Sequence, residues 1–306
     1  MQGRVVEVCV SANKGERKRA VELIEMVENH GIAGDAHAGP WHRQVSLLAE
    51  ESIEKMRAKG LSVGPGDFAE NITTRGLPLA DLPVGTTMLA GKCVLRITQI
   101  GKECHTRCAI YHLAGDCVMP REGIFAEVLR GGHLRSGDRV YVLPEFRAAV
   151  ITLSDRCYRN ETVDESGPRL VEELKLWGAE VDGVLLPDEA ALLTAKLREL
   201  VSSGKYSLIL TTGGTGLSAR DVTPEATLQV IDRLVPGISE SIRAESMKIT
   251  PHAMLSRGVA GLAGRTLVVN LPGSVKGAPE SFAILSGALP HALEVLSGDT
   301  LDCGRQ

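Results

Sequence analysis

The chain of 306 residues is poor in aromatic side chains, which make up 3% of it, and its formal net charge is −4. Proteins that bind single-stranded nucleic acids stack bases on aromatic side chains in a basic groove. The scarcity of aromatic side chains and the lack of net positive charge therefore both argue against nucleic acid as a partner. No apolar run approaches the roughly 18 residues that a membrane span needs. We expect a protein that binds neither nucleic acid nor membrane.

The seven cysteines include no C-x-x-C pair, and their number is odd. A chain of this length can bury a large core without disulfides. The first residues show no long apolar core and no small-residue cleavage site, so they do not have the pattern of a signal peptide. These features predict a cytoplasmic protein with reduced thiols.

Glycine is abundant by contrast, with 33 residues, and such an excess is typical of tight turns and of backbone that approaches a ligand closely. The length predicts two domains of roughly 100–200 residues each. The balance of charge changes at the segment 144–147, with 18 basic and 18 acidic residues before Phe146 and 16 basic and 20 acidic residues from there on. We therefore place one domain at 1–145 and a second at 146–306.

The second half alternates short apolar segments with amphipathic ones, which predicts an α/β/α domain with a doubly wound, mostly parallel sheet. The predicted strands are 148–153, 180–186, 206–212 and 266–271. A helix is expected from Thr223, as N-cap, to residue 237, and a last helix over 278–297. The first half is β-rich and barrel-like, with strands at 4–11, 44–49, 85–91, 93–100 and 138–143 and helices near 50–59 and 121–130.

Segments rich in hydroxyl, carboxylate and glycine residues follow the predicted strands of the second half. They are Ser154-Asp155, Pro187-Asp188-Glu189, TTGGTG (211–216) and NLPGS (270–274). The carboxyl ends of parallel strands meet at one edge, where ligands of open α/β sheets bind. Glycine-rich backbone can cradle an anion there, although an ordinary turn would use the same residues.

Two carboxylates, Asp188 and Asp221, lie just past these strand ends. Magnesium usually takes one or two protein carboxylates together with substrate phosphates. The pair therefore suits Mg²⁺ beside a phosphate site, and the alternative for either residue alone is a helix cap.

Several motifs of residues 148–298 resemble those of the molybdopterin adenylyltransferase (MogA/MoaB-like) family. They are TLSDR (152–156), DESGPRL (164–170), the step at 187–189, TTGGTG, RDVTPEAT (220–227), PGISE (236–240) and NLPGSVK (270–276). The resemblance implies an enzyme that forms homotrimers through this domain. It would transfer AMP from Mg-ATP to molybdopterin and release pyrophosphate, and molybdopterin-AMP would then serve a molybdate-insertion enzyme.

The resemblance also implies roles for individual residues. Asp188 and Asp221 take the family's two essential carboxylate positions and would hold Mg²⁺, while Arg220 is either an anion partner or a solvated side chain. The expected pterin or nucleotide contacts are Ser154, Asp155, Thr212, Gly213, Gly214, Thr215, Gly216, Glu240, Arg243, Pro272, Gly273 and Ser274.

The first half contains a Cys/His cluster in GKECHTRCAIYHLAGDC (101–117). Its residues allow three interpretations: a zinc site, inert structural thiols, or one reactive or metal-ligating thiol whose pKa is lowered by basic neighbours. This half resembles a MOSC domain, named for the C-terminal domain of molybdenum cofactor sulfurase. The resemblance rests on GDAHAG (34–39), RQVSLL (43–48), GDFAENI (66–72), the segment around Cys104 and GDRV (137–140).

Members of that family have a β-rich fold and are thought to bind the molybdenum cofactor or to carry sulfur on a cysteine. Cys104 matches the family cysteine and is the catalytic candidate, although Glu103 stands where a proline is common. The candidate pocket residues are His37, Arg43, Asn71 and Arg121, each of which could instead make structural hydrogen bonds.

The hypothesis is a fused enzyme of molybdenum cofactor biosynthesis, whose second domain adenylylates molybdopterin and whose first domain binds or modifies a pterin or the cofactor. One alternative is a carrier or storage protein that holds the cofactor without turnover. Another is an independent sulfur-handling role for the first domain.

Overall fold

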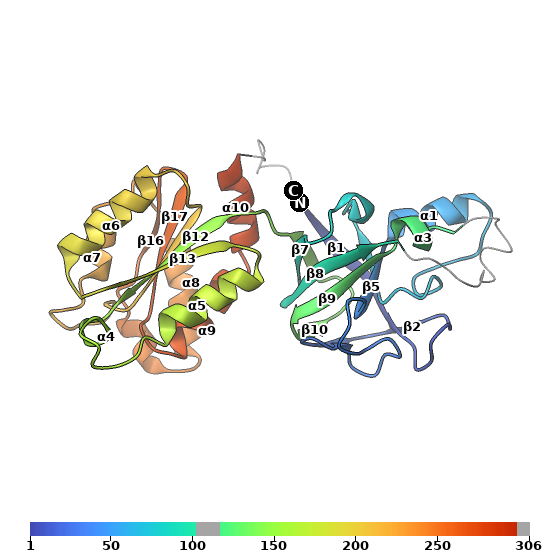
Figure 1. Ribbon diagram of the computed structural model, residues 1–306, viewed down its shortest axis with the longest axis horizontal. Coiled ribbons are helices and arrows are strands. Elements are labelled where there is room, and N and C mark those ends of the chain that lie inside the picture. Colours follow the sequence, from blue (N-terminus) through green and yellow to red (C-terminus); the bar gives the residue numbers. More distant parts are fainter. Residues whose placement is uncertain (102–116, 299–306) are drawn as a thin grey trace. The chain divides into compact units, whose positions relative to one another are not determined.

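Contacts within the chain separate two units, Met1–Leu143 and Pro144–Gln306. The computed structural model describes residues 1–101 and 117–298 (Figure 1). None of the helices in these two ranges combines the length and the apolarity that a membrane crossing needs.

The first unit is built around a closed barrel of seven strands. Around the barrel these are β11 (Arg139–Val142), β7 (Thr87–Ala90), β8 (Cys93–Ile100), β9 (Ile124–Arg130), β5 (Val45–Ala49), β6 (Ile72–Arg75) and β1 (Gln2–Val10), and pairing of β1 with β11 closes the ring. β5 and β6 are parallel, and the other pairs are antiparallel. The expected barrel-like fold is confirmed.

Smaller elements flank the barrel. β2 (Arg19–Val21) pairs with β1, and a separate sheet has the order β10 (Gly132–Leu134), β3 (Ile24–Val27), β4 (Gly31–Ile32). The helical segments are α1 (Glu50–Ala58), η1 (Leu79–Asp81) and α3 (Met119–Glu122). α1 and α3 cover an outer apolar layer that includes Ile53, Met56 and Met119.

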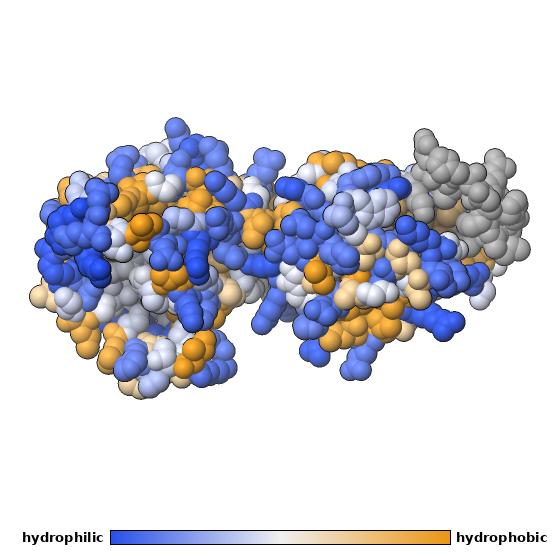
Figure 2. Space-filling model, turned by 60° about the horizontal axis from the view of Figure 1, so that its bottom comes forward, coloured by the Kyte–Doolittle hydropathy of each residue, from blue (hydrophilic) through white to orange (hydrophobic). Residues whose placement is uncertain are grey.

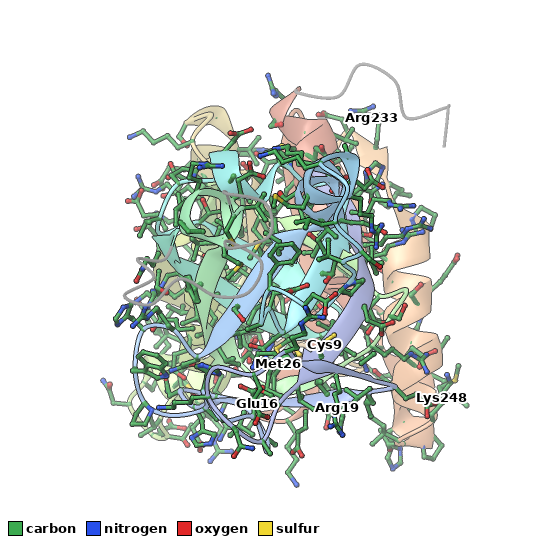
Figure 3. All side chains as sticks on the ribbon, turned by 90° about the vertical axis from the view of Figure 1, so that its right-hand side faces the viewer. Cys9, Glu16, Arg19, Met26, Arg233 and Lys248 are labelled. Carbon is green, nitrogen blue, oxygen red and sulfur yellow. The ribbon has the colours of Figure 1, made fainter. Side chains whose placement is uncertain are left out.

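Alternating apolar residues of the strands fill the barrel, because successive side chains of a strand point to opposite faces. Val5, Leu47 and Leu95 are among the fully buried members. Cys9 and Met26, labelled in Figure 3, are also buried in this unit. Burial raises the pKa of the Cys9 thiol to about 12, with the charge of Glu70 adding to the effect, so this cysteine is not a reactive thiolate.

The prediction of a helix near 121–130 is wrong, because α3 ends at Glu122 and the strand β9 follows. Ile124, Ala126 and Val128 alternate into the barrel core. That period of two places one face of the segment in the core only if it is a strand. Pairing with β5 and β8 on either side then satisfies its backbone.

The second unit contains a six-stranded sheet. Its order is β13 (Glu180–Leu186), β12 (Arg147–Leu153), β14 (Leu208–Thr212), β17 (Thr266–Leu271), β16 (Ala260–Ala263) and β15 (Arg233–Leu234). The first four strands are parallel, and β16 and β15 continue the sheet antiparallel. The four strands expected from the sequence are the parallel ones.

Helices lie on both sides of this sheet (Figure 1). α6 (Ala190–Ser202) and α7 (Thr223–Leu228) pack on the face that carries Ile151, Ile209 and Val268. α5 (Ser166–Leu176) contacts β12 and β13, and α9 (Gly277–Leu285) contacts β17. The remaining helical segments are α4 (Asp155–Tyr158), α8 (Pro236–Met247), η2 (Pro251–Leu255) and α10 (Leu289–Ser297). The arrangement is consistent with the expected doubly wound sheet.

Three expectations about helices of this unit need correction. The helix expected to run to residue 237 ends at Leu228, because Arg233 and Leu234 pair with β16 as a strand. The helix α8 follows this strand, and the sequence analysis did not predict it. Thr223 is the first helical residue rather than the N-cap, and its Oγ1 donates to the Gly213 carbonyl at 2.8 Å. The last expected helix is divided into α9 and α10.

Candidate functional site

The four motif-bearing segments of the second unit meet at one edge of its sheet. The register pairs Leu153 with Leu186 and Thr212 with both Thr152 and Leu271. All four parallel strands therefore end at about the same level, and the residues that follow them come together there. The edge is the carboxyl edge, as the sequence analysis expected.

A glycine turn forms the middle of this edge. Gly213 and Gly214 have φ values of +103° and +64°, a region that side chains other than glycine rarely adopt. A Cβ on Gly213 would clash with the Leu153 carbonyl, and a Cβ on Gly273 would lie 2.9 Å from the Gly213 Cα. Thr212 Oγ1 donates to the Pro272 carbonyl at 2.8 Å. The TTGGTG and NLPGS segments are thus in backbone contact, and only glycine allows that approach.

Asp155 and Asp188 exchange hydrogen bonds beside the turn. The Asp155 N–H donates to Asp188 Oδ2 at 2.9 Å, and the Asp188 N–H donates to Asp155 Oδ1 at 3.1 Å. Arg220 donates to both oxygens of Asp155, with Nη2 at 2.7 Å from Oδ2. This guanidinium lowers the pKa of Asp155. Ser154 caps α4 by accepting from the Cys157 N–H.

Asp188 and Asp221 lie against the two ends of the glycine turn. Asp188 Oδ1 lies 3.5 Å from the Cβ position of Gly214, and Asp221 Oδ2 lies 2.9 Å from that of Gly216. Burial raises the pKa of Asp188, and the charges of Asp155 and Asp221 raise it further against the opposing effect of Arg220. Negative charge therefore accumulates beside the turn.

This carboxylate pair fits a magnesium ion. Within residues 1–101 and 117–298, no hydrogen bond occupies Asp188 Oδ1 or Asp221 Oδ1, so each carboxylate keeps an oxygen for a cation. No group of three or more His, Cys, Asp or Glu side chains suited to a metal occurs in those ranges. Two carboxylates are nevertheless what magnesium uses when substrate phosphates complete its shell.

A cavity of about 280 Å³ opens beside the glycine turn. Figure 2 shows a hollow in this unit, in which residues of intermediate hydropathy, drawn white, gather. The predicted site residues Thr215, Gly216, Arg243, Pro272 and Ser274 line the cavity. The rest of its wall comes from α8, η2, α9 and the residues that flank η2, including Ile242, His252, Leu255, Ser256, Glu280 and Ser281.

The other predicted residues of this unit lie outside the cavity lining. Glu240 is exposed on α8. Ser154, Asp155 and Asp188 surround the other end of the glycine turn, at Gly214. The structure thus separates the predicted residues into a cavity group and a carboxylate group, joined by the segment 213–216.

Sequence reasoning missed Arg257, which contacts three parts of this site. Its side chain donates to the Gly216 carbonyl at 2.7 Å and to the Asp221 carbonyl at 2.5 Å, and it pairs with Glu225. Nothing in the local sequence marks this arginine, because its partners lie 32–41 residues away along the chain.

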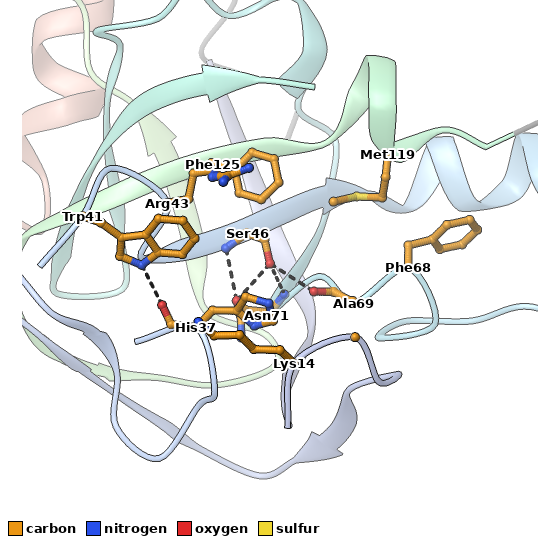
Figure 4. Close-up of a pocket in the computed structure, with 11 residues that line it drawn as sticks. Lys14, His37, Trp41, Arg43, Ser46, Phe68, Ala69, Asn71, Met119 and Phe125 are labelled. Carbon is orange, nitrogen blue, oxygen red and sulfur yellow. Dashed lines mark hydrogen bonds between the residues drawn. The ribbon is translucent and has the colours of Figure 1, made fainter. Parts of the chain in front are cut away.

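The first unit has a cavity of about 290 Å³ of its own (Figure 4). Three of the four predicted pocket residues, His37, Arg43 and Asn71, line it. The fourth, Arg121, is exposed and lines a different cavity, near α1 and η1. The remaining lining residues were not foreseen and are Lys14, Gly15, Trp41, Ser46, Phe68, Ala69, Met119 and Phe125.

Buried polar residues support the floor of this cavity. Asn71 donates to Asp35 Oδ2 at 3.0 Å and accepts from the Ser46 N–H at 3.1 Å. Asp35 forms an ion pair of 2.5 Å with Lys18, and neither side chain is exposed to solvent. Burial raises the pKa of Asp35, but hydrogen bonds from His37 and Lys18 outweigh it and hold the pKa well below its usual value. Asn71 therefore does have the structural role that the sequence analysis left open.

Two aromatic rings lie beside the Arg43 guanidinium. The guanidinium carbon of Arg43 lies 4.9 Å from the ring centroid of Trp41 and 5.7 Å from that of Phe125. Its Nε is buried and has no hydrogen-bond partner among the residues that the structure describes. Trp41 is held in turn, because its Nε1 donates to the His37 carbonyl at 2.8 Å (Figure 4). The presence of Trp41, one of two tryptophans in the chain, two residues from Arg43 was a signal that could have been used.

The candidate Cys104, with most of its Cys/His cluster, lies outside the described residues. Cys117, the last of that segment, is buried.

Comparison with known proteins matches both units. The MOSC domain family matches residues 34–141, and the family described as "Probable molybdopterin binding domain" matches residues 149–291. The chain is 35% identical over 153 residues to the molybdopterin adenylyltransferase of Helicobacter pylori, covering 49% of this chain and 87% of that protein. The chain belongs to the MogA/MoaB-like family. Its second unit carries that relationship, and its first unit is a MOSC domain.

Two further relatives match the same half of the chain. The molybdenum cofactor synthesis protein cinnamon of Drosophila melanogaster is 43% identical over 152 residues, which are 49% of this chain and 25% of that protein. The crystal structure of the molybdopterin biosynthesis enzyme MoaB from Thermus thermophilus shares 46% identity, with 50% of this chain and 97% of that chain covered and a TM-score of 0.46. The chain thus spans about a quarter of the length of cinnamon.

Proposed function

We propose that the MogA/MoaB-like unit transfers AMP from ATP to molybdopterin in molybdenum cofactor biosynthesis. The observation that carries the proposal is the placement of Asp188 and Asp221 against the glycine turn, next to a cavity that the predicted pterin contacts line. The name of the Helicobacter relative, molybdopterin adenylyltransferase, supports it.

The geometry suits phosphoryl chemistry, in which positioning and electrostatics do most of the work. An oxygen of the molybdopterin phosphate attacks the α-phosphorus of ATP. The bond from that phosphorus to the oxygen bridging to the β-phosphorus breaks, and pyrophosphate leaves with the electron pair. The backbone of 213–216 can orient phosphate oxygens beside the cavity. Asp188 and Asp221 would hold magnesium, which neutralises phosphate charge when bound.

The test is to mix the protein with molybdopterin and Mg-ATP and to measure pyrophosphate and molybdopterin-AMP. We expect Asp221→Asn to lower the rate by about 100-fold or more. The substitution removes a proposed ligand of the cation, and a bound cation stabilises the transition state by several kcal/mol. Asp232→Asn is the matched control, since Asp232 is an exposed carboxylate that bonds the Gly264 N–H away from this edge. Full activity of Asp221→Asn would refute the assignment.

The same experiment distinguishes the carrier alternative. A carrier would bind molybdopterin tightly, yet no pyrophosphate would appear at any concentration of Mg-ATP. The free carboxylate oxygens beside the turn favour the enzyme, because pterin storage alone gives no reason to gather negative charge beside a phosphate site.

For the MOSC domain, we propose that its cavity binds a pterin or the molybdenum cofactor through an anionic group. The observation that favours this is Arg43, which lines the cavity and whose buried Nε has no partner within residues 1–101 and 117–298. Among the described residues, the lining contains no carboxylate, whereas Lys14 adds a second positive charge. Aromatic rings of Trp41 and Phe125 offer stacking surfaces for a planar ring system.

The fluorescence of Trp41 measures ligand binding to this cavity. The other tryptophan, Trp177, is fully buried in the other unit, and Trp177→Phe leaves Trp41 as the only indole. Molybdopterin is expected to quench its fluorescence. Arg43→Gln should weaken binding about 10–100-fold, since hydrogen bonds to charged groups contribute about 1.5–3 kcal/mol. Arg96→Gln, at an exposed arginine paired with Glu127, should keep the affinity, and equal affinity of the Arg43 variant would contradict the proposal.

Three further predictions accompany this function. They are a homotrimer formed through the second unit, a molybdate-insertion enzyme as partner, and sulfur transfer on Cys104. Sedimentation velocity tests the first and copurification with such an enzyme the second. Labelling with sulfane sulfur, compared with Cys104→Ser, tests the third.

A further inference from the structure

The side chain of Arg257 braces the turn that carries Asp221. Arg257 lies in the connection between η2 and β16. Its Nε donates to the Gly216 carbonyl at 2.7 Å, and its Nη2 donates to the Asp221 carbonyl at 2.5 Å. The Arg257 backbone N–H donates to the Thr215 carbonyl at 2.9 Å. One residue thus joins the beginning and the end of the segment 215–221.

Within that segment, the Asp221 carboxylate is held in a narrow place. Its Oδ2 accepts from the Ser218 N–H at 2.7 Å and lies 2.9 Å from the Cβ position of Gly216. The Asp221 N–H donates to the Ser218 carbonyl at 2.9 Å. If Gly216 and Asp221 move apart, the carboxylate therefore moves relative to the glycine turn.

Arg257 is itself held from both sides. Arg243 of α8 donates to the carbonyls of Ser256 and Gly258, at 3.4 and 3.1 Å, which flank Arg257. The Val259 N–H donates to Oδ1 of the buried Asn270 at 3.2 Å. The brace is thus anchored on α8 and on β17, both outside the turn that it supports.

We propose that Arg257 is a positioning residue that keeps Asp221 in register with the glycine turn. The proposal rests on the proposed role of Asp221 in holding a cation and nucleotide. The hydrogen bonds of Arg257 to the two carbonyl groups carry this positioning role. Its third partner, Glu225, is half-exposed, and exposed ion pairs contribute little to stability.

An arginine suits this place because its planar guanidinium presents donors in fixed and divergent directions. A lysine ammonium in the same place could reach one carbonyl but could not span both with comparable geometry. The conservative variant Arg257→Lys therefore keeps the charge and removes the brace, and Glu225→Gln removes the ion pair and keeps the brace.

The first measurement is binding of Mn²⁺ in the presence of a non-hydrolysable ATP analogue, together with kcat and KM. We expect Arg257→Gln to weaken Mn²⁺ binding about 5–30-fold and to lower kcat about 10–100-fold, as small misplacements of a catalytic group do. The KM for molybdopterin should change less than about threefold, and Arg257→Lys should restore only part of the loss. Glu225→Gln should stay within about twofold in all of these.

A double-mutant cycle tests whether the effect runs through Asp221. In the Asp221→Asn background, Arg257→Gln should change Mn²⁺ binding by less than about twofold, because coupled residues are non-additive. An equal effect in both backgrounds would overturn the positioning role.

Amide hydrogen exchange of residues 216–221 separates this inference from the proposed function. It should accelerate in Arg257→Lys and not in Glu225→Gln. Lack of pyrophosphate release by the unaltered chain contradicts the proposed function alone. Unchanged exchange and unchanged Mn²⁺ affinity in a folded Arg257→Lys variant contradict the brace, and this variant serves if Arg257→Gln does not fold.

Discussion

The candidate sites of the two units are supported by different means. In the MOSC domain, the cavity floor lies on buried charge, with Lys18 and Asp35 paired at 2.5 Å and Asn71 bonded to the same carboxylate. In the MogA/MoaB-like unit, the site is supported by backbone, through Gly213, Gly214 and carbonyl groups that accept from side chains.

The charged side chains of the two candidate sites also differ in sign. Arg43 and Lys14 are the charged residues among the described lining of the first cavity, which suits direct contact with an anion. In the second unit Asp188 and Asp221 place negative charge beside the glycine turn, which suits a phosphate only together with the proposed magnesium ion. The comparison teaches that the two proposed sites differ both in the sign of their charged side chains and in the structure that supports them.

The largest effect should come from breaking the buried ion pair. Lys18→Met leaves the Asp35 carboxylate buried and without its ammonium partner, which costs about 3–5 kcal/mol. Urea unfolding should show the MOSC transition moving and the second transition unchanged. Lys14→Met, at an exposed lysine of the same segment, should change stability by no more than about 0.5 kcal/mol. Equal shifts in the two variants would show that the pair is not the support.

The backbone of the second unit should be the next most sensitive. Gly214→Ala places a methyl group against Thr223 Oγ1 at a φ of +64°, and we expect a cost of about 1–3 kcal/mol with loss of AMP transfer. Gly237→Ala is the control, because a Cβ there meets nothing within 4 Å and lies in the helix α8. A Gly214→Ala protein with normal activity and melting temperature would contradict the importance of the turn.

Acid should weaken the MOSC domain through Asp35. The pKa of this buried carboxyl lies below its ordinary value because hydrogen bonds from His37 and Lys18 outweigh burial. The stabilisation is therefore complete above the ordinary pKa of 3.8 and is lost as the pH falls through the lowered one. We expect a loss of about 1–2 kcal/mol between pH 6 and pH 3. Chemical denaturation at several pH values measures this loss. Asp188 has a raised pKa, so protonation of that carboxyl does not contribute to any acid weakening of the other unit.

The smallest effect concerns the ring beside Arg43. Trp41→Leu removes the indole that lies 4.9 Å from the guanidinium, and we expect ligand affinity to fall about 2–5-fold, which corresponds to a cation–π contribution of about 0.5–1 kcal/mol. Trp41→Phe keeps an aromatic face and should lose less. Calorimetric titration with molybdopterin measures both, and an equal loss in the two variants would point to the Nε1 hydrogen bond instead, because both lack that donor.

Elements with a strong local pattern were predictable. The strands β12, β13, β14 and β17 were found because each is a short apolar run followed by a turn signal. β9 was mistaken for a helix because its alternation is only visible once pairing with β5 and β8 is known. The helix α8 was missed because the expected helix from Thr223 was extended across β15, whose pairing with β16 is a tertiary contact.

The candidate sites divide in the same way. His37, Arg43 and Asn71 were placed by motif and do line one cavity, whereas Arg121 belongs to another, because its position depends on how α3 packs. Arg257 and the Lys18–Asp35 pair carried no local signal, since their partners lie 17–41 residues away.

The sequence by itself determined the membership in the MogA/MoaB-like and MOSC families and the chemistry available at the strand ends, because motifs such as TTGGTG are local and their glycines act through their own backbone. Only the tertiary structure decided which side chains share a cavity, which carboxylates keep a free oxygen, and which arginine braces the turn. Those properties depend on distances between segments that are far apart along the chain, and such distances are set by packing rather than by any single motif.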